Sequence, residues 1–323
     1  MKILKDCTED QITQAAQALI DGHLVAFPTE TVYGLGADAS NASAISRVYE
    51  VKGRPKDHPL IVHISSVNQI TNWASEIPDY AFELAAKFWP GPMTLILPRS
   101  PLAKDFITGG QNSIGLRIPS HPLALKLFRN FEDLGGKGIA APSANRFGAI
   151  SPTTAEAAIQ ELGKYLKENA LILDGDQSLV GIESTIIDCT KAVPCILRPG
   201  SITLDMIKKV LNLDISQVNS YGDVRTSGMH VSHYAPNAQV VFDEKIQPGD
   251  GLIALASVPT PAEVTRLASP NSVEEFARDL YQSLRKADSL GLKRISIILP
   301  KGEGLATAIR DRVARAAGSL MHL

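Results

Sequence analysis

Short apolar runs alternate with amphipathic segments through the first two hundred residues. A segment that follows Thr8 has apolar positions at helical spacing from 12 to 20, and it predicts a helix that ends at Gly22. Apolar runs of strand length occupy 24–27, 60–64, 93–97, 114–118, 139–141, 171–173, 184–188 and 195–197. Further helical patterns occupy 43–51, 79–88, 122–130, 153–166 and 204–211. Because several strands follow one another without a helix between them, the order predicts an α/β fold with a twisted, mixed sheet.

The pattern changes between 213 and 237. This stretch is polar, contains glycine and has no period, so we expect a linker. Long aperiodic segments in ordered proteins are often functional, and we therefore expect it to act as a lid. Regular patterns resume with strands at 239–242, 252–256 and 295–299 and helices at 273–289 and 303–317. We predict one domain over 1–212, a linker over 213–237 and a smaller α/β domain over 238–323.

Composition narrows the class of protein. The chain has 323 residues, of which 44% are hydrophobic and 20% charged, as in ordinary globular proteins. Its net charge is -2, whereas proteins that coat nucleic acid non-specifically carry a large basic surplus. No apolar run is long enough to span a membrane, and the N-terminus has no signal-peptide core, so we expect a cytoplasmic protein. Three cysteines without a Cys-x-x-Cys pair predict neither disulfides nor a zinc site.

Two nucleotide-binding signatures can be set aside. The stretch from Gly34 to Ala39 fits a loose Gly-x-Gly-x-x-Ala dinucleotide fingerprint. Those glycines should follow a strand directly and open a helix, but Pro-Thr-Glu-Thr-Val-Tyr intervenes after the predicted strand. The sequence also has no P-loop motif, so any nucleoside triphosphate would be held in another way.

A cluster of cations on a stiff loop is the first candidate for binding chemistry. Lys52, Arg54 and Lys56 lie within five residues, flanked by prolines, and Gly53 allows an unusual backbone between the first two. Clustered Lys and Arg suit phosphate. A solvated charged loop is the alternative interpretation.

Small polar residues and one isolated arginine supply further candidates. The stretch 138–154 ends a strand in a turn that contains Ser143 and Asn145, and Ser151 is placed to cap a helix opened by Pro152. Such turns bind anions, although a turn with a helix cap explains them equally well. Arg117 lies on an apolar strand, so it needs an anionic partner, either a ligand or a structural carboxylate. The chemistry favoured is charge stabilisation on an anionic substrate rather than covalent catalysis.

Taken together, these segments resemble the threonylcarbamoyl-AMP synthases, the YrdC-domain proteins of tRNA modification. The matching stretches are 27–36, Lys52-Gly-Arg54-Pro, 59–63, Trp89-Pro-Gly-Pro-Met-Thr94, 115–119, Ala141-Pro-Ser143-Ala-Asn145 and Glu183-Ser184-Thr185. His233-Tyr234-Ala-Pro236 resembles the end of the linker in the long, two-domain form. The resemblance implies a YrdC-like domain with a concave, positively charged cavity and a smaller Rossmann-like C-terminal domain.

The reaction that the resemblance implies condenses L-threonine, bicarbonate or CO2 and ATP to threonylcarbamoyl-AMP and pyrophosphate. The Lys-x-Arg and Ser-x-Asn signature, which implies the catalytic groups, falls on Lys52, Arg54, Ser143 and Asn145. The residues implied for ATP are Arg54, His58, Ser113, Ser143, Ser151, Arg198 and Tyr234. Those implied for L-threonine are Thr31, His63, Arg117, Ala141 and Ser184. Mg2+ would arrive with the substrate phosphates, with no protein metal site and no organic cofactor.

The product would be handed to a threonylcarbamoyl transferase complex that acts on tRNA, without direct nucleic-acid binding by this chain. Two departures from the family pattern stand out. His58 occupies a position where many relatives have Asn, and the linker reads Ser227-Gly-Met-His-Val-Ser-His-Tyr, in which Val231 and Ser232 replace a Tyr and an Arg. Two alternatives stay open: an RNA-binding module, and the carbamoyl-transfer domain of hydrogenase maturation, which shares the signature but has additional acylphosphatase and zinc-finger regions.

Overall fold

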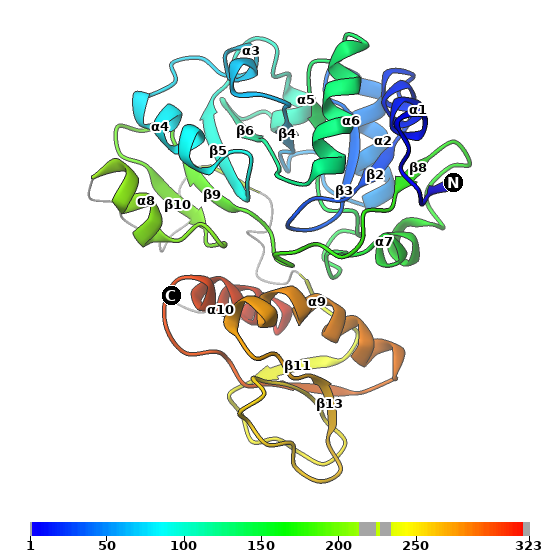
Figure 1. The fold of residues 1–323 in the computed structure, drawn as a ribbon, viewed down its shortest axis with the longest axis vertical. Helices are drawn as coiled ribbons and strands as arrows, with labels where there is room; N and C mark the ends of the chain where they lie inside the picture. Colours follow the sequence, from blue (N-terminus) through cyan, green and yellow to red (C-terminus); the bar gives the residue numbers. More distant parts are fainter. Residues whose placement is uncertain (1, 213–223, 227–233, 319–323) are drawn as a thin grey trace.

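The computed structural model describes residues 2–212, 224–226 and 234–318. Two sheets of different size organise the chain (Figure 1). The strands of the large sheet are β1 (Lys2–Leu4), β2 (Val25–Phe27), β3 (Gly34–Asp38), β4 (Ile61–His63), β5 (Met93–Pro98), β6 (Ser113–Arg117), β7 (Ile139–Ala140), β8 (Leu171–Leu173), β9 (Thr185–Asp188) and β10 (Cys195–Arg198). The helices around it are α1 (Glu9–Ile20), α2 (Ala42–Lys52), η1 (Val67–Gln69), α3 (Ile70–Trp73), α4 (Asp79–Phe88), α5 (Asp105–Thr108), α6 (Pro122–Asp133), α7 (Ala155–Leu162) and α8 (Leu204–Leu211).

The large sheet is mixed, as the sequence predicts. Its strand order is β1-β8-β2-β3-β7-β4-β6-β5-β9-β10. The pairs β1–β8, β2–β8, β4–β6 and β5–β9 are parallel, and the remaining pairs are antiparallel. Val25 and Phe27 face a core shared with α1 and α6, whereas Ala26 faces a second core that contains residues of α2 and α4. Successive strand residues point to opposite faces, so this sheet is covered on both sides.

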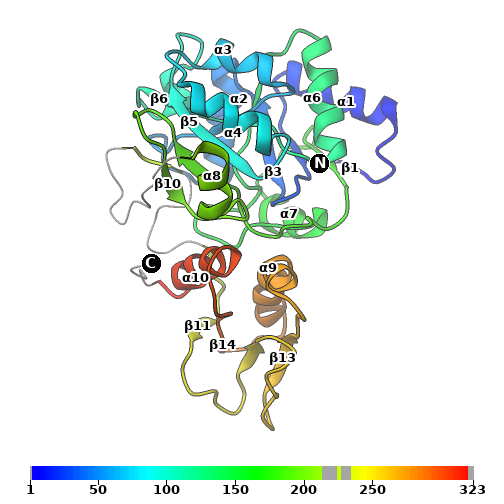
Figure 2. The same cartoon turned by 60° about the vertical axis from the view of Figure 1, so that its left-hand side comes forward.

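The small sheet is parallel throughout, with the order β11-β14-β12-β13. Its strands are β11 (Gln239–Phe242), β12 (Gly251–Ile253), β13 (Thr265–Ala268) and β14 (Arg294–Ile297), and its helices are α9 (Val273–Ser289) and α10 (Leu305–Ala316). Both helices lie on the side of the small sheet that faces the rest of the chain (Figures 1 and 2). They are therefore the elements through which the C-terminal part can reach the large sheet.

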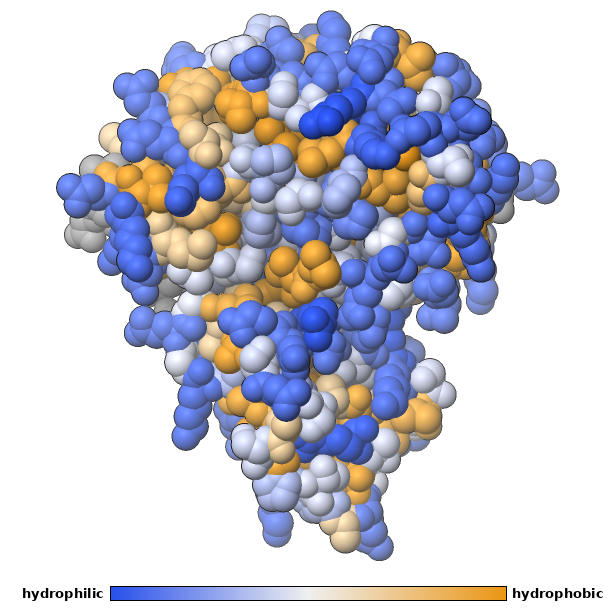
Figure 3. Space-filling model, viewed as in Figure 1, coloured by the Kyte–Doolittle hydropathy of each residue, from blue (hydrophilic) through white to orange (hydrophobic). Residues whose placement is uncertain are grey.

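One apolar cluster crosses the boundary between the two parts. Val32, Ile150 and Ile182 from the N-terminal part pack with Phe276 of α9 and Val313 of α10 in a single buried cluster. Outside this contact the face of the molecule in Figure 3 is mainly hydrophilic, with apolar residues scattered over it. Within the described ranges, no helix is both long enough and apolar enough to cross a bilayer. The domain limits at 212 and 238 stay predictions, and most of the linker lies outside the described residues.

Two segments differ from the predicted elements. The glycine-bearing stretch from Gly34, for which no strand was predicted, forms strand β3, antiparallel to β2. It does not open a helix, in agreement with setting the dinucleotide fingerprint aside. The predicted helix at 153–166 is shorter, and Thr154 caps it in place of Ser151 because the Thr154 side chain accepts the Ala157 N–H. The patterns also miss β1 and β13, in which few residues are buried and alternation is weak.

Candidate functional site

The cationic loop begins where helix α2 ends. Its last residue is Lys52, and Gly53 follows with a left-handed φ of 61°, as the sequence suggested. This left-handed backbone favours glycine, whereas a Cβ here would meet only the guanidinium end of the Arg146 side chain, at 2.5 Å, which can shift. This turn sends Lys52 and Arg54 inward, where both side chains are buried. The solvated loop that was the alternative interpretation therefore does not describe Lys52 and Arg54, although Lys56, the third cation of the loop, is exposed.

The Lys52 side chain binds the turn that contains Ser143 and Asn145. Its Nζ donates to the backbone carbonyls of Ser143, at 2.6 Å, and Asn145, at 2.5 Å. Burial and the neighbouring Arg54 guanidinium hold the pKa of Lys52 well below its usual value. The ammonium group thus fixes the turn between Ser143 and Asn145.

Arg54 lies beside an aromatic ring that also contacts His58. Its Nη2 donates to the Pro59 carbonyl at 2.9 Å, and its guanidinium carbon lies 5.9 Å from the centre of the Phe147 ring. The His58 ring meets Phe147 edge-on, with 5.3 Å between ring centres. Burial lowers the pKa of Arg54 to about 10, so the side chain keeps its positive charge at neutral pH.

These segments enclose a cavity of about 60 Å3. Nine of the residues singled out from the sequence line it: Thr31, Arg54, His63, Arg117, Ala141, Ser143, Ser184, Arg198 and Tyr234. These residues are far apart in the sequence. The fold brings them together, because β4 and β6 run side by side and the loops after β2 and β7 lie next to each other. Three of the nine carry a guanidinium group, which makes the lining suited to an anion.

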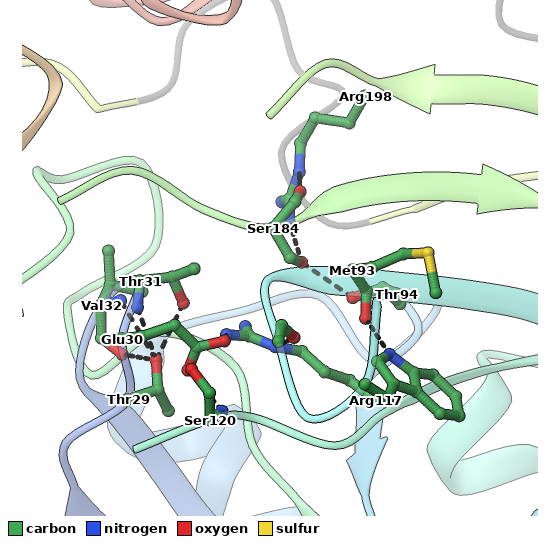
Figure 4. Close-up of polar contacts among 12 residues, drawn as sticks. Thr29, Glu30, Thr31, Val32, Met93, Thr94, Arg117, Ser120, Ser184 and Arg198 are labelled. Carbon is green, nitrogen blue, oxygen red and sulfur yellow. Dashed lines mark hydrogen bonds and ion pairs between the residues drawn. The ribbon is translucent and has the colours of Figure 1, made fainter. Parts of the chain in front are cut away.

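Arg117 has a structural carboxylate as its partner. Its Nη2 lies 2.7 Å from Oε1 of Glu30, and both side chains are 6% exposed. Its Nε donates to the Gly91 carbonyl at 3.3 Å, and the second Glu30 oxygen accepts the Ser120 N–H (Figure 4). Among the described residues, no hydrogen bond is formed by Nη1 of Arg117. The guanidinium is therefore held in place by Glu30 while one edge stays available to a ligand.

Two buried polar atoms near Arg117 and Lys52 lack hydrogen-bond partners among the described residues. They are Nδ1 of His63 and Oδ1 of Asn145, whose amide nitrogen donates to the carbonyls of Arg146 and Ala149. Burial, with a contribution from Arg117, lowers the pKa of His63 to about 3, so its ring is neutral. Unsatisfied buried polar atoms are rare in folded proteins, and of these two residues His63 lines the cavity, where such an atom indicates a place for a ligand group.

Ser184 and Arg198 form a second polar chain on the opposite wall. Arg198 donates to Ser184 through Nε to the carbonyl, at 3.0 Å, and through Nη2 to Oγ, at 3.1 Å. The Ser184 and Thr94 hydroxyls are 2.8 Å apart, which extends the chain to strand β5 (Figure 4). All three side chains are buried, so these contacts hold the Ser184 side chain in place where it lines the cavity.

Glu183 connects this wall to the C-terminal part. It lines the cavity and accepts the Ser151 hydroxyl at 2.6 Å, Arg312 Nε at 2.8 Å and the Tyr281 hydroxyl at 2.9 Å. Burial alone would raise the pKa of Glu183, but the charges of Arg312 and Arg198 outweigh it and bring the pKa to about 2. The Tyr234 ring stacks on Tyr281 with 5.5 Å between ring centres.

The remaining predicted residues lie outside the cavity lining. Lys52 and Asn145 support it from behind, and Ser151 reaches it through Glu183. Ser113 lines a separate, smaller cavity beside Arg225 of the linker, and His58 sits behind Phe147. The catalytic and substrate-binding roles of all the predicted site residues, Ser113 and His58 included, stay predictions.

Sequence reasoning missed three residues that the geometry brings forward: Glu30, Thr94 and Glu183. All three lie inside stretches that were compared with a known family, and Glu30 and Glu183 are each next to a selected residue. These residues are distinguished by their tertiary contacts, which the sequence does not reveal. The only signal available in the sequence was their position: Glu30 precedes Thr31, Thr94 ends the Trp89–Thr94 stretch, and Glu183 precedes Ser184.

The site offers cations and oriented hydroxyls rather than metal ligands. Among the described residues, no three His, Cys, Asp or Glu side chains are grouped as a metal site requires. Glu183, the carboxylate in the cavity lining, has both oxygens engaged in hydrogen bonds. The fold and site thus define an α/β protein with a buried, arginine-lined cavity built for a small anionic ligand.

Comparison with known proteins gives the family. The family model described as "Telomere recombination" matches residues 17–200, and the one described as "Threonylcarbamoyl-AMP synthase, C-terminal domain" matches residues 202–318. The chain is 40% identical to threonylcarbamoyl-AMP synthase of Pyrococcus abyssi, over 96% of this chain and 95% of the relative. It is 37% identical to the Bacillus subtilis synthase, over 96% and 94%. The chain belongs to the threonylcarbamoyl-AMP synthase family.

A solved structure agrees with this assignment over nearly the whole chain. The crystal structure of P. abyssi Sua5 complexed with L-threonine has a TM-score of 0.88 and 38% identity, and the alignment covers 98% of this chain and 97% of that one. Escherichia coli YciO, at 21% identity and a TM-score of 0.52 over 62% of this chain and 94% of that one, shares the fold of the N-terminal part. The resemblance noted from the sequence is thereby confirmed.

Proposed function

We propose that this protein is an L-threonylcarbamoyladenylate synthase, a nucleotidyltransferase that makes threonylcarbamoyl-AMP and pyrophosphate from L-threonine, bicarbonate and ATP. The observation that carries the proposal is the arginine-lined cavity inside a chain that matches both family domains. The match of residues 202–318 to the synthase C-terminal domain also favours this function over the carbamoyl-transfer domain of hydrogenase maturation. The RNA-binding alternative finds no support in the net charge of -2.

The two substrates can be placed against different residues of the cavity lining. In our proposal Arg117, oriented by Glu30, pairs with the threonine carboxylate through its remaining edge, while Thr31, His63 and Ala141 surround the side chain. The neutral His63 ring can accept a hydrogen bond from the threonine hydroxyl through Nδ1. Ser184, held by Arg198 and Thr94, completes the pocket.

The other side of the cavity suits the nucleotide. The threonine nitrogen attacks bicarbonate and forms a carbamate with release of water and a proton, and a carbamate oxygen then attacks the α-phosphorus of ATP as pyrophosphate leaves. Negative charge collects on the phosphate oxygens, and Arg54, Arg198 and the Ser143 turn fixed by Lys52 stabilise it. Ser151 and Tyr234 would then border the nucleotide.

Magnesium enters this proposal with ATP. The described residues do not form a protein-ligated magnesium site, so we derive no step through the ion and assign it no residues. It would neutralise charge on the triphosphate when bound. We further propose that the protein works in the cytoplasm and hands its product to a threonylcarbamoyl transferase complex that acts on tRNA.

Pyrophosphate release tests the function. The purified protein is given ATP and Mg2+, and L-threonine, bicarbonate or both are omitted in turn. We expect release only with both present, and the same rate with or without added tRNA. Arg54→Ala should reduce the rate about 100-fold, whereas Lys56→Ala, exposed on the same loop, should leave it unchanged. Release that needs neither threonine nor bicarbonate, or that requires RNA, would exclude this function.

A further inference from the structure

The C-terminal part places one arginine against the candidate site. Arg312 of helix α10 has no exposed surface. Its Nε donates to Glu183 at 2.8 Å, and its Nη2 donates to the Pro199 carbonyl at 3.1 Å. Nη1 contacts the carboxylate of Asp311. The guanidinium is thus fixed at three points, two of which belong to the N-terminal part.

The same arginine also contacts the end of the linker. Its guanidinium carbon lies 5.6 Å from the centre of the Tyr234 ring, which stacks on Tyr281 at an interplanar angle of 28°. The Tyr281 hydroxyl donates to the Glu183 oxygen that accepts Arg312. Because Tyr234 lines the cavity, Arg312 and Tyr281 support two of its walls at once.

Three arginines and two carboxylates are buried together beside the cavity. Arg198, Arg312 and Arg315 lie with Glu183 and Asp311, and all five side chains are at most 7% exposed. Arg315 pairs with Asp311 at 3.0 Å, and the charges of Arg312 and Arg198 both lower the pKa of Glu183. Because Arg198 and Tyr234 also line the cavity, a phosphate group on that side would lie close to these cations.

We propose that Arg312 is a positioning residue for the nucleotide side of the site: it holds Glu183, and through Glu183 the Ser151 hydroxyl, and it supports the Tyr234 ring. This rests on the proposed function in taking the ligand to be ATP. The C-terminal part of the chain then supplies the buried arginine that contacts Glu183 and Tyr234. Threonine, on the Arg117 side, depends on it little.

The test compares nucleotide and amino-acid binding in the full chain. Dissociation constants for ATP with Mg2+ and for L-threonine are measured separately by calorimetry for the wild type and Arg312→Met. The variant should bind ATP at least about tenfold more weakly and threonine within about twofold of the wild type. Arg310→Met is the matched control, since Arg310 lies on the same helix and bonds only to Pro300 and Thr307 among the described residues. It should bind both ligands like the wild type.

A double-mutant cycle with Glu183→Gln shows whether Arg312 acts through Glu183. In the Glu183→Gln background, Arg312→Met should weaken ATP binding by less than about threefold, because the group it positions is already changed. If circular dichroism shows that Arg312→Met is unfolded, Arg312→Lys, which keeps the charge and loses the fork, takes its place with the same expected bias toward ATP.

Any of three results would overturn the proposal. Arg312→Met could weaken ATP and threonine binding equally, or it could bind both ligands as Arg310→Met does. In the double mutant, the separate effects of Arg312→Met and Glu183→Gln on the ATP dissociation constant could simply multiply. A wild type that binds no ATP would overturn it together with the proposed function. If the wild type binds ATP with the expected dependence on Arg312 but forms no threonylcarbamoyl-AMP, only the proposed function fails.

Discussion

At the scale of single residues, Arg117 carries the proposed recognition of the amino acid. Replacing it with lysine keeps the positive charge but loses the planar fork that spans Glu30 and a ligand carboxylate. Arg117→Lys should weaken threonine binding about ten- to hundredfold, as loss of a charge-assisted hydrogen bond does, and leave ATP binding within about twofold. Calorimetry measures both. Weaker ATP binding with unchanged threonine affinity would move Arg117 to the nucleotide side.

His63 makes a pH-dependent contribution to stability. Its pKa falls from 6.5 to about 3 on folding, chiefly through burial, so the unfolded chain binds more protons between these values. The contribution is fully present above pH 6.5, and it falls by about 1.4 kcal/mol for each pH unit below that until about pH 3. Between pH 6.5 and 5 the wild type should therefore lose about 2 kcal/mol of unfolding free energy more than His63→Gln, measured by urea denaturation. Equal losses in the two proteins would show that His63 is not buried in its neutral form.

Residue types in the sequence indicated the chemistry of the site but not its pairings. Arg117 on an apolar strand required an anionic partner, and both alternatives were open; the structure shows Glu30 in that place. Ser151 was read as a helix cap because Pro152 follows it, yet its hydroxyl bonds to Glu183. Such partners are separated by dozens of residues, so only the tertiary fold brings them together.

At the scale of elements, the end of α2 and the loop after β7 form one unit through Lys52. Lys52→Met leaves the carbonyls of Ser143 and Asn145 without their donor in a buried place. The unfolding free energy should fall by about 2–4 kcal/mol and the rate of pyrophosphate release by about 100-fold. Chemical denaturation and the release assay measure these changes, with Lys56→Met as the exposed control. A normal rate with reduced stability would limit Lys52 to a structural role.

Elements with strong periodicity were predicted, and those without it were missed. Helix α9 shows a clear apolar face, and helix α1 has its Thr8 cap, so both follow from the sequence. Strand β3 has two glycines in five residues, which weakens any strand signal, but its neighbours leave no room for larger side chains: a Cβ on Gly36 would lie 2.7 Å from Phe27. Tertiary contact, rather than local preference, makes this segment a strand.

At the scale of the whole molecule, the two parts meet where Gly181 approaches helix α9. Gly181 has a φ of 80°, and a Cβ there would lie 2.3 Å from the Arg278 backbone. Gly181→Ala should push α9 away from Glu183 and Tyr234, lower the melting temperature and weaken ATP binding about tenfold. Gly249→Ala is the control, since its φ is 85° but nothing lies within 4 Å, so it carries the backbone strain without the clash. Identical ATP binding in the two variants would show that the contact with α9 does not support the site.

The central claim is that threonine binds in this cavity with ATP beside it, and a crystal structure of the full chain with L-threonine and a non-hydrolysable ATP analogue tests it most directly. The account predicts the threonine carboxylate within hydrogen-bond distance of Arg117, and the phosphates against Arg54 and Ser143. It also predicts the nucleotide on the side of Ser151, Arg198 and Tyr234. Threonine bound outside the cavity, or its carboxylate held by Arg54 or Arg198 with Arg117 bonded to Glu30 alone, would contradict it.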